Sequence, residues 1–141
     1  MVINMDREEI KKILPHREPM LLVDTVEITE ENKAVGTYTI KQDEWFLQGH
    51  FPGNPIVPGV ILCEIMAQTC CVLFVDKIQG KTPYYTGLNN VKFKNKVRPG
   101  DTVIMECSIM KQRHPFYFVE GKGYVDGKLS VSGEFSFAIL D

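Results

Sequence analysis

The chain has 141 residues, of which 44% are hydrophobic and 24% are charged. This length suits one domain, 1–141, with a buried core, and the composition excludes a disordered chain. The formal net charge of −2 and a pI of about 5.9 argue against a generic nucleic-acid binder. The first residues, MVINMDREEIKKIL, lack the basic start and apolar stretch of a secretory signal.

The first predicted elements are a short helix and two strands. In MDREEIKKIL, Asp6 can cap the helix, and Glu9 follows at the spacing of a capping box. The stretches 20–28 and 33–40 have strand-like sequences with a polar turn between them. We expect the short helix to cover an edge or an end of the domain.

A long apolar run follows, from Gly59 to about Lys77. It is too long for a strand and has no turn residue after Gly59, so it predicts a helix of four to five turns. A membrane span is the alternative. The run is slightly short for one and carries Glu64 and Gln68, which favours a buried helix in a soluble protein.

The rest of the chain reads as strands near 84–97, 101–113, 116–125 and 128–140. The sequence VDGK between the last two is typical of a hairpin turn. One buried helix and about six antiparallel strands predict an α+β domain with a curved sheet around the helix. Because one small sheet cannot enclose such a helix, its remaining face is expected to meet a second subunit.

The four cysteines, at positions 63, 70, 71 and 107, have no C-x-x-C spacing. Three of them lie in the apolar run, where a free cysteine behaves as a small hydrophobic residue. The pattern therefore predicts neither a metal site nor a disulfide framework, and it favours a reducing cytoplasm.

The stretch HFPGNPIVPG leads into the long helix. Its prolines favour a stiff, extended path, and this path would fix His50 relative to the helix start at Gly59. Free N–H groups at a helix N-terminus stabilise negative charge, and a glycine lets a substrate carbonyl approach closely. The pattern predicts an oxyanion hole at Gly59. A Pro-x-x-P ligand for another domain is the alternative.

One carboxylate, Glu64, lies within the apolar run, with Gln68 on the same helix face at i+4. A buried carboxyl group that stays protonated is a useful proton donor, and His50 would supply the matching base. The alternative is structural: Gln68 caps Glu64, and His50 bonds to the loop backbone. The other histidines carry weaker signals. His16 is interpreted as a loop residue, with substrate contact as its alternative, and His114 as a surface turn residue.

Three segments carry a family resemblance: LPHREPMLLVD at 14–24, HFPGNPIVPGVILCEIMAQ at 50–68 and NVKFKNKVRPGD at 90–101. Together they resemble the bacterial β-hydroxyacyl-acyl carrier protein dehydratases of type II fatty-acid synthesis, over essentially the whole chain. The resemblance implies the hotdog fold, in which an antiparallel sheet wraps a long helix. The chain departs from the family pattern at Asn90, Asn95 and Lys96, which affects the expected tunnel lining.

The resemblance also assigns residues. It implies His50 as the general base and Glu64 as the general acid. The residues that it implies for substrate binding are the oxyanion glycine Gly59, the acid-orienting Gln68, the tunnel gate Tyr84, with Tyr85 as the adjacent alternative, and Phe51. The peptide bond between His50 and Phe51 is expected to be cis.

The implied reaction is the dehydration of a (3R)-3-hydroxyacyl chain to the trans-2-enoyl product in fatty-acid elongation, without a metal or an organic cofactor. The implied partner is acyl carrier protein, which presents the chain on its phosphopantetheine arm. A homodimer assembling into a trimer of dimers is expected, without nucleic acid or membrane insertion. Two other functions stay open: a hotdog thioesterase and a non-catalytic acyl-binding module.

A basic stripe is expected to dock the acidic carrier. Lys92, Lys94, Lys96 and Arg98 alternate along the sequence, so an extended strand would place all four on one face. Such a stripe on an acidic protein can steer an acidic partner by long-range attraction. The alternative is a solvated sheet face with no partner.

Overall fold

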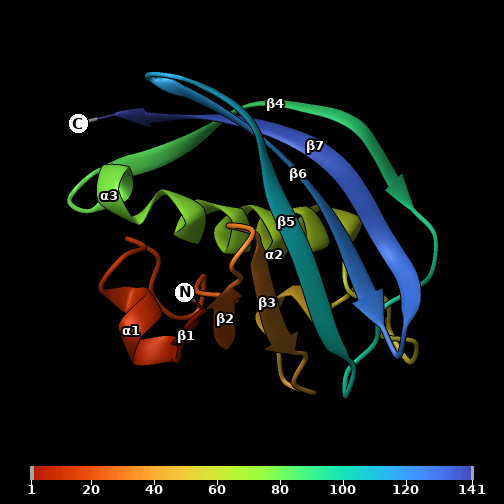
Figure 1. Cartoon of the computed structure of the whole chain (residues 1–141). Helices are drawn as coiled ribbons and strands as arrows, with labels where there is room; N and C mark the ends of the chain where they lie inside the picture. Colours follow the sequence, from red (N-terminus) through yellow and green to blue (C-terminus); the bar gives the residue numbers. More distant parts are fainter. Residues whose placement is uncertain (1, 141) are drawn as a thin grey trace.

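The computed structural model describes residues 2–140, which form a curved antiparallel sheet wrapped around a central helix (Figure 1). The strand order in the sheet is β1-β2-β3-β5-β6-β7-β4. The strands are β1 (Ile3–Met5), β2 (Thr25–Ile28), β3 (Ala34–Thr39), β4 (Thr82–Phe93), β5 (Thr102–Arg113), β6 (Phe116–Val125) and β7 (Lys128–Leu140). The arrangement confirms the α+β fold class and the expected sheet around a helix.

The N-terminal region differs in part from the prediction. Helix α1 (Arg7–Lys11) has the expected capping box, with Asp6 and Glu9 bonded to each other's backbone N–H groups.

Strand β1 was not predicted, and the strand predicted over 20–28 begins only at Thr25. Residues 21–23 lie in the core, but Leu21 O, Leu22 N and Val23 O bond to the side chains of Arg7 and Gln68.

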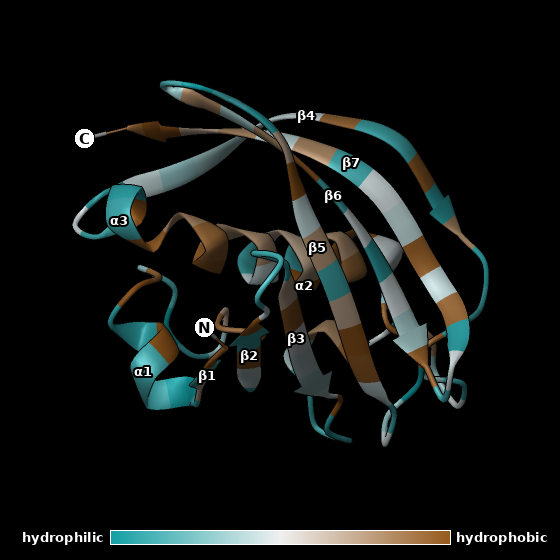
Figure 2. Ribbon diagram, in the orientation of Figure 1, coloured by the Kyte–Doolittle hydropathy of each residue, from teal (hydrophilic) through white to brown (hydrophobic). Residues whose placement is uncertain are grey.

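The long apolar run is helical, as predicted, but it has an irregular turn. Helix α2 (Gly59–Cys71) passes through a 3₁₀ turn (Val72–Phe74) into α3 (Val75–Ile78). The run Gly59–Ile78 is apolar and long enough to span a membrane, yet 67% of its most apolar window is buried inside the domain. Figure 2 shows this apolar helix lying along the concave face of the curved sheet.

Two glycines let α2 lie very close to the sheet. A Cβ atom on Gly36 of β3 would lie 2.5 Å from Thr69 Oγ1, and one on Gly121 of β6 would lie 2.6 Å from the sulfur of Met66. Both contacts are closer than van der Waals packing allows. The helix face that carries Thr69 and Met66 is therefore seated against strand positions that must have no side chain.

The C-terminal strands agree closely with the predicted ones, except that β4 ends at Phe93 rather than near 97. The β6–β7 hairpin has Asp126 at φ 50° and Gly127 at φ 77°, the two positive angles of a type I′ turn. Alternate residues of β7 point into the core. These are Val131, Phe135, Phe137 and Ile139. All four cysteines are free and buried.

Candidate active site

A small cavity of about 50 Å³ lies between α2 and β4. Its lining residues are His16, Glu64, Ala67, Gln68, Cys71, Pro83, Tyr84, Tyr85 and Phe137. Three of the predicted site residues therefore meet here: Glu64, Gln68 and Tyr84. Apolar side chains, among them Ala67, Pro83 and Phe137, line much of the rest, so the Glu64 carboxyl group faces a partly open space that is less polar than bulk water. Such a setting strengthens its electrostatic interactions.

Gln68 fixes the Glu64 carboxyl group, as the i+4 spacing predicted. Its Nε2 donates to Glu64 Oε2 at 2.9 Å and to the backbone oxygen of Met20 at 2.8 Å, while its Oε1 accepts from Leu22 N at 2.8 Å. The amide is buried, and its three bonds leave one orientation for it. Glu64 is thus held by its own helix and by the loop before β2.

His16, which was interpreted as a loop residue, also lies beside Glu64, the candidate acid. Its Nε2 is 3.6 Å from Glu64 Oε2, and both side chains are about one-fifth exposed (20% and 21%). The two residues are 48 positions apart, so no helical or strand periodicity links them. The available signal was the place of His16 within the LPHREPMLLVD segment.

Two tyrosines of β4 line the cavity. Tyr84, the expected gate residue, is more than half exposed. Tyr85 donates its hydroxyl to the backbone oxygen of Cys63 in α2 at 2.9 Å. Although its ring is partly exposed, its hydroxyl end is enclosed, and burial raises the pKa of this hydroxyl. Tyr85 therefore stays a hydrogen-bond donor to the helix across the neutral range.

His50 lies in the loop before α2 and does not line the cavity that contains Glu64. Its Nδ1 is 2.9 Å from the backbone oxygen of Ile56, and its ring stacks on Phe51 at a centroid distance of 4.2 Å. The His50–Phe51 peptide bond is cis, as the family resemblance implied. Within one chain, the candidate base and the candidate acid thus belong to separate parts of the site.

Helix α2 begins at Gly59, after Pro58, which has no side chain able to cap it. The N–H groups of Ile61 and Leu62 donate to Pro58 O, whereas Gly59 N has no acceptor among residues 2–140. A Cβ on Gly59 would lie 2.9 Å from the ring of Phe93. The glycine therefore also makes room for an aromatic ring, a packing role that the sequence did not reveal.

The basic stripe needs a correction. Only Lys92 lies within β4, because the strand ends at Phe93 and Asn95 lies in a bend. Strand alternation therefore cannot place Lys94, Lys96 and Arg98 on one face, although all four cationic side chains are exposed.

The asparagines that departed from the family pattern make local bonds in this region. Asn90, at φ 52°, donates to Glu134 Oε2, and Asn95 donates to Leu129 O. Asparagine tolerates the positive φ angle that position 90 requires. These two departures therefore have a structural explanation in the end of β4 and its contact with β7.

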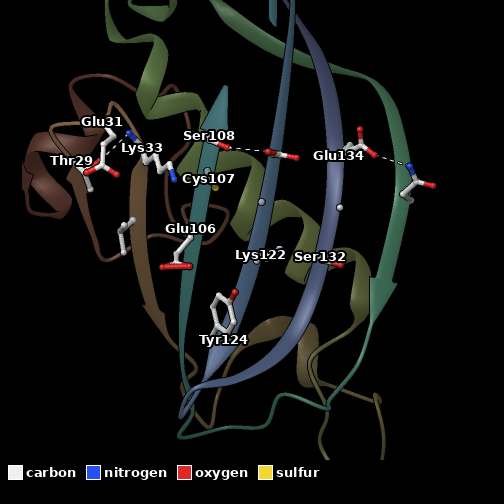
Figure 3. A pocket seen from close by; sticks show the side chains of 15 residues that line it. Thr29, Glu31, Lys33, Glu106, Cys107, Ser108, Lys122, Tyr124, Ser132 and Glu134 are labelled. Atoms are coloured by element: carbon white, nitrogen blue, oxygen red, sulfur yellow. Dashed lines mark hydrogen bonds between the residues drawn. The ribbon is translucent and has the colours of Figure 1, made fainter. Parts of the chain in front are cut away.

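A larger cavity of about 630 Å³ lies over the outward-facing side chains of β3, β5, β6 and β7 (Figure 3). Glu106 and Glu120 line it together with Lys122. Within residues 2–140 its lining includes none of the predicted catalytic or substrate-binding residues. Size alone therefore does not mark the candidate active site in this fold.

Comparison with known proteins assigns this chain to a family. The FabA-like domain family matches residues 14–134. The 3-hydroxyacyl-(acyl-carrier-protein) dehydratase FabZ of Clostridium perfringens (strain SM101 / Type A) is 45% identical over 137 residues, covering 96% of this chain and 99% of that protein. The FabZ protein of Streptococcus pneumoniae (strain CGSP14) is also 45% identical, over 96% and 98%.

A solved structure, the dehydratase heterocomplex ApeI:P from Xenorhabdus doucetiae, superposes with a TM-score of 0.81 at 21% identity and covers 94% of this chain and 91% of that one. The E. coli PaaI protein covers 75% of each chain with a TM-score of 0.59 and 16% identity. These structural likenesses establish the hotdog fold. The family match and the close relatives establish more: the chain belongs to the FabA-like family and, within it, to the FabZ dehydratases.

Proposed function

We propose that this chain dehydrates (3R)-3-hydroxyacyl chains carried by acyl carrier protein to trans-2-enoyl chains during fatty-acid elongation. The observation that supports this most directly is the Glu64 carboxyl group, which Gln68 holds against a largely apolar cavity beside the central helix. The names of the close relatives supply the substrate class. Glu64 acts as the general acid and His50 as the general base.

The contacts of His50 suit a base. The backbone oxygen of Ile56 can only accept a hydrogen bond, so Nδ1 carries the proton and Nε2 keeps its lone pair. Nε2 takes a proton from C2 of the acyl chain. The thioester oxygen gains negative charge in this step, and the free N–H of Gly59 donates to it at the start of α2.

Glu64 completes the reaction by protonating the 3-hydroxyl group as the C3–O bond breaks. The C2–H electrons form the new double bond, and water leaves with the proton from Glu64. A proton then returns from His50 to Glu64 through solvent, so neither residue is changed overall. Tyr84 and Phe51 contact the acyl chain, with Tyr84 beside the cavity that contains Glu64. No step uses a metal or an organic cofactor.

Each site is shared by two copies of the chain, with His50 from one copy facing Glu64 from the other. Two observations support this. His50 is absent from the lining of the cavity that contains Glu64. Large apolar side chains are also exposed near the start of α2 and along the edge strand β4. They are Phe51, Val60, Leu88 and Phe93. A second copy would bury them. Three such dimers assemble into a hexamer.

The carrier docks on the four exposed cations after the bulge in β4, which are Lys92, Lys94, Lys96 and Arg98. Their positive charge would attract an acidic carrier over a distance of about one Debye length, roughly 8–10 Å at physiological ionic strength. The reaction takes place in the cytoplasm, in keeping with four free, buried cysteines.

A product assay tests the proposed function. The purified chain is incubated with 3-hydroxybutyryl and 3-hydroxydecanoyl thioesters, and the products are separated and identified. A dehydratase gives the ultraviolet absorbance of a conjugated enoyl thioester, and we expect this product. A thioesterase would release free thiol instead, and a binding module would give no product. Either of those two results would overturn the proposal.

A further inference from the structure

The two oxygens of the Glu64 carboxyl group have different surroundings. Oε2 accepts from Gln68 Nε2 at 2.9 Å and lies 3.6 Å from His16 Nε2. Oε1 has no hydrogen-bond partner among residues 2–140. A carboxyl oxygen offers two acceptor positions. If Gln68 and His16 both donate to Oε2, both of its positions are filled, and the proton of the acid must be on Oε1.

The surroundings of His16 select one tautomer. Its Nδ1 is buried and has no partner, so a proton there would be an unpaired, buried N–H group, which costs about 1–3 kcal/mol. The proton therefore belongs on Nε2, the nitrogen that faces Glu64. The separation of 3.6 Å between His16 Nε2 and Glu64 Oε2 is longer than a hydrogen bond. Catalytic bonds are often this long without substrate and shorten in the complex.

The loop that carries His16 is built to hold it there. Arg17 donates to the backbone oxygens of Leu14 and His16 at 2.9 Å and 2.6 Å, which closes the turn around His16. Arg7 donates to the backbone oxygen of Leu21 at 2.7 Å and ties the loop to α1. The loop therefore provides His16 itself and the two backbone groups, Met20 O and Leu22 N, that orient Gln68.

We propose that His16 is a positioning residue for the catalytic acid. When substrate binds, the Nε2–H of His16 closes onto the second acceptor position of Glu64 Oε2 and confines the transferable proton to Oε1, the oxygen left for the substrate. This inference rests on the proposed role of Glu64. Without His16 the proton divides between the two oxygens and the carboxyl group can rotate, so that fewer bound substrates meet a correctly placed proton. The loss falls on kcat rather than on KM.

A matched set of substitutions tests this role. In His16→Gln an amide N–H can reach the place of Nε2, whereas His16→Met has a similar length and no donor. We expect His16→Met to lower kcat by about 10-fold or more with KM within about 2-fold, and His16→Gln to keep kcat within about 3-fold of the original chain. His16→Asn has a donor that is too short to reach Glu64, and it should match His16→Met.

Glu64→Gln is measured in the same series, with thermal unfolding of every variant. If His16→Met does not fold, His16→Asn provides the comparison with His16→Gln. Equal kcat values for the donor and non-donor variants, or a loss confined to KM, would overturn the role of His16 while an inactive Glu64→Gln upholds the proposed function. Full activity of Glu64→Gln would overturn both.

Discussion

The acid side and the base side of the proposed site are held in opposite ways. Glu64 lies on a buried helix, and Gln68 ties it to a loop from a distant part of the chain. His50 lies in a loop before that helix, and its side chain makes one hydrogen bond within residues 2–140, to a backbone oxygen six residues away. The comparison teaches that one chain holds the Glu64 carboxyl group in place by itself, whereas the proposed pairing of His50 with Glu64 requires a second copy of the chain.

Replacing either residue should have the largest effect. We expect Glu64→Gln and His50→Ala each to lower kcat by at least about 100-fold, the usual scale for general acid and base groups, while the protein stays folded. Glu120→Gln makes the same chemical change on the outer face of the sheet and should leave kcat unchanged. Turnover near the original rate in either site variant would refute the assigned role.

Mixing two inactive variants tests whether acid and base come from different chains. A dimer of one His50→Ala chain and one Glu64→Ala chain has one site with both changes and one site with neither. With random pairing about half of the dimers are hybrids, so activity should recover to roughly a quarter of the original value.

Each parent treated alone under the same exchange conditions should stay inactive. Native mass spectrometry of differently tagged chains would show whether subunits have exchanged. If hybrids form and no activity returns, His50 and Glu64 must meet within one chain, and the contrast between the two sides of the site disappears.

Gln68→Leu should reveal how firmly the acid side is built. It leaves the buried Leu22 N–H without a partner, at about 1–3 kcal/mol, and also removes the partner of the part-buried Met20 C=O at a smaller cost. We expect urea unfolding to show a loss of about 2–4 kcal/mol, and kcat to fall by about 10-fold. Thr25→Val, at an exposed position of β2, removes one exposed side-chain hydrogen bond to Thr37 Oγ1 and should cost less than about 1 kcal/mol. Equal losses would contradict this account.

Charge reversal on the proposed docking surface should have the smallest and most selective effect. Lys94→Glu combined with Lys96→Glu should raise KM for carrier-bound substrate by about 10-fold, and by less than about 2-fold for a small thioester. High salt should reduce the difference. Lys33→Glu combined with Lys122→Glu changes the net charge equally at the outer-face cavity and serves as the control. Equal effects on both substrates would refute the docking surface.

The sequence predicted well where local spacing determines the structure. The i+4 spacing placed Gln68 against Glu64, and the VDGK turn fixed the β6–β7 hairpin. Alternation along β7 identified its buried face. Each of these depends on neighbours within a few residues, for which helix and strand geometry leave few choices.

Contacts between distant segments could not be predicted in the same way. The approach of His16 to Glu64 depends on how a loop turns, and the contact of the Phe93 ring with Gly59 joins the end of β4 to the start of α2. Residues 20–23 have the apolar character of a strand, yet Met20 O, Leu21 O and Leu22 N bond to the side chains of Arg7 and Gln68. Side-chain partners of this kind leave no periodic signal in the sequence.

The close packing of α2 on the sheet constrains how the sequences of related chains can diverge. Gly36 and Thr69 share a space that cannot take one more methyl group, so the size of either residue constrains the other. We expect paired exchange among related chains: an alanine at position 36 should accompany a smaller residue at position 69. Gly121 and Met66 should be coupled in the same way. Residues that line the cavity would then change more freely than residues packed between α2 and the sheet. The substrate range could evolve in this way while the position of Glu64 relative to the sheet stays constant.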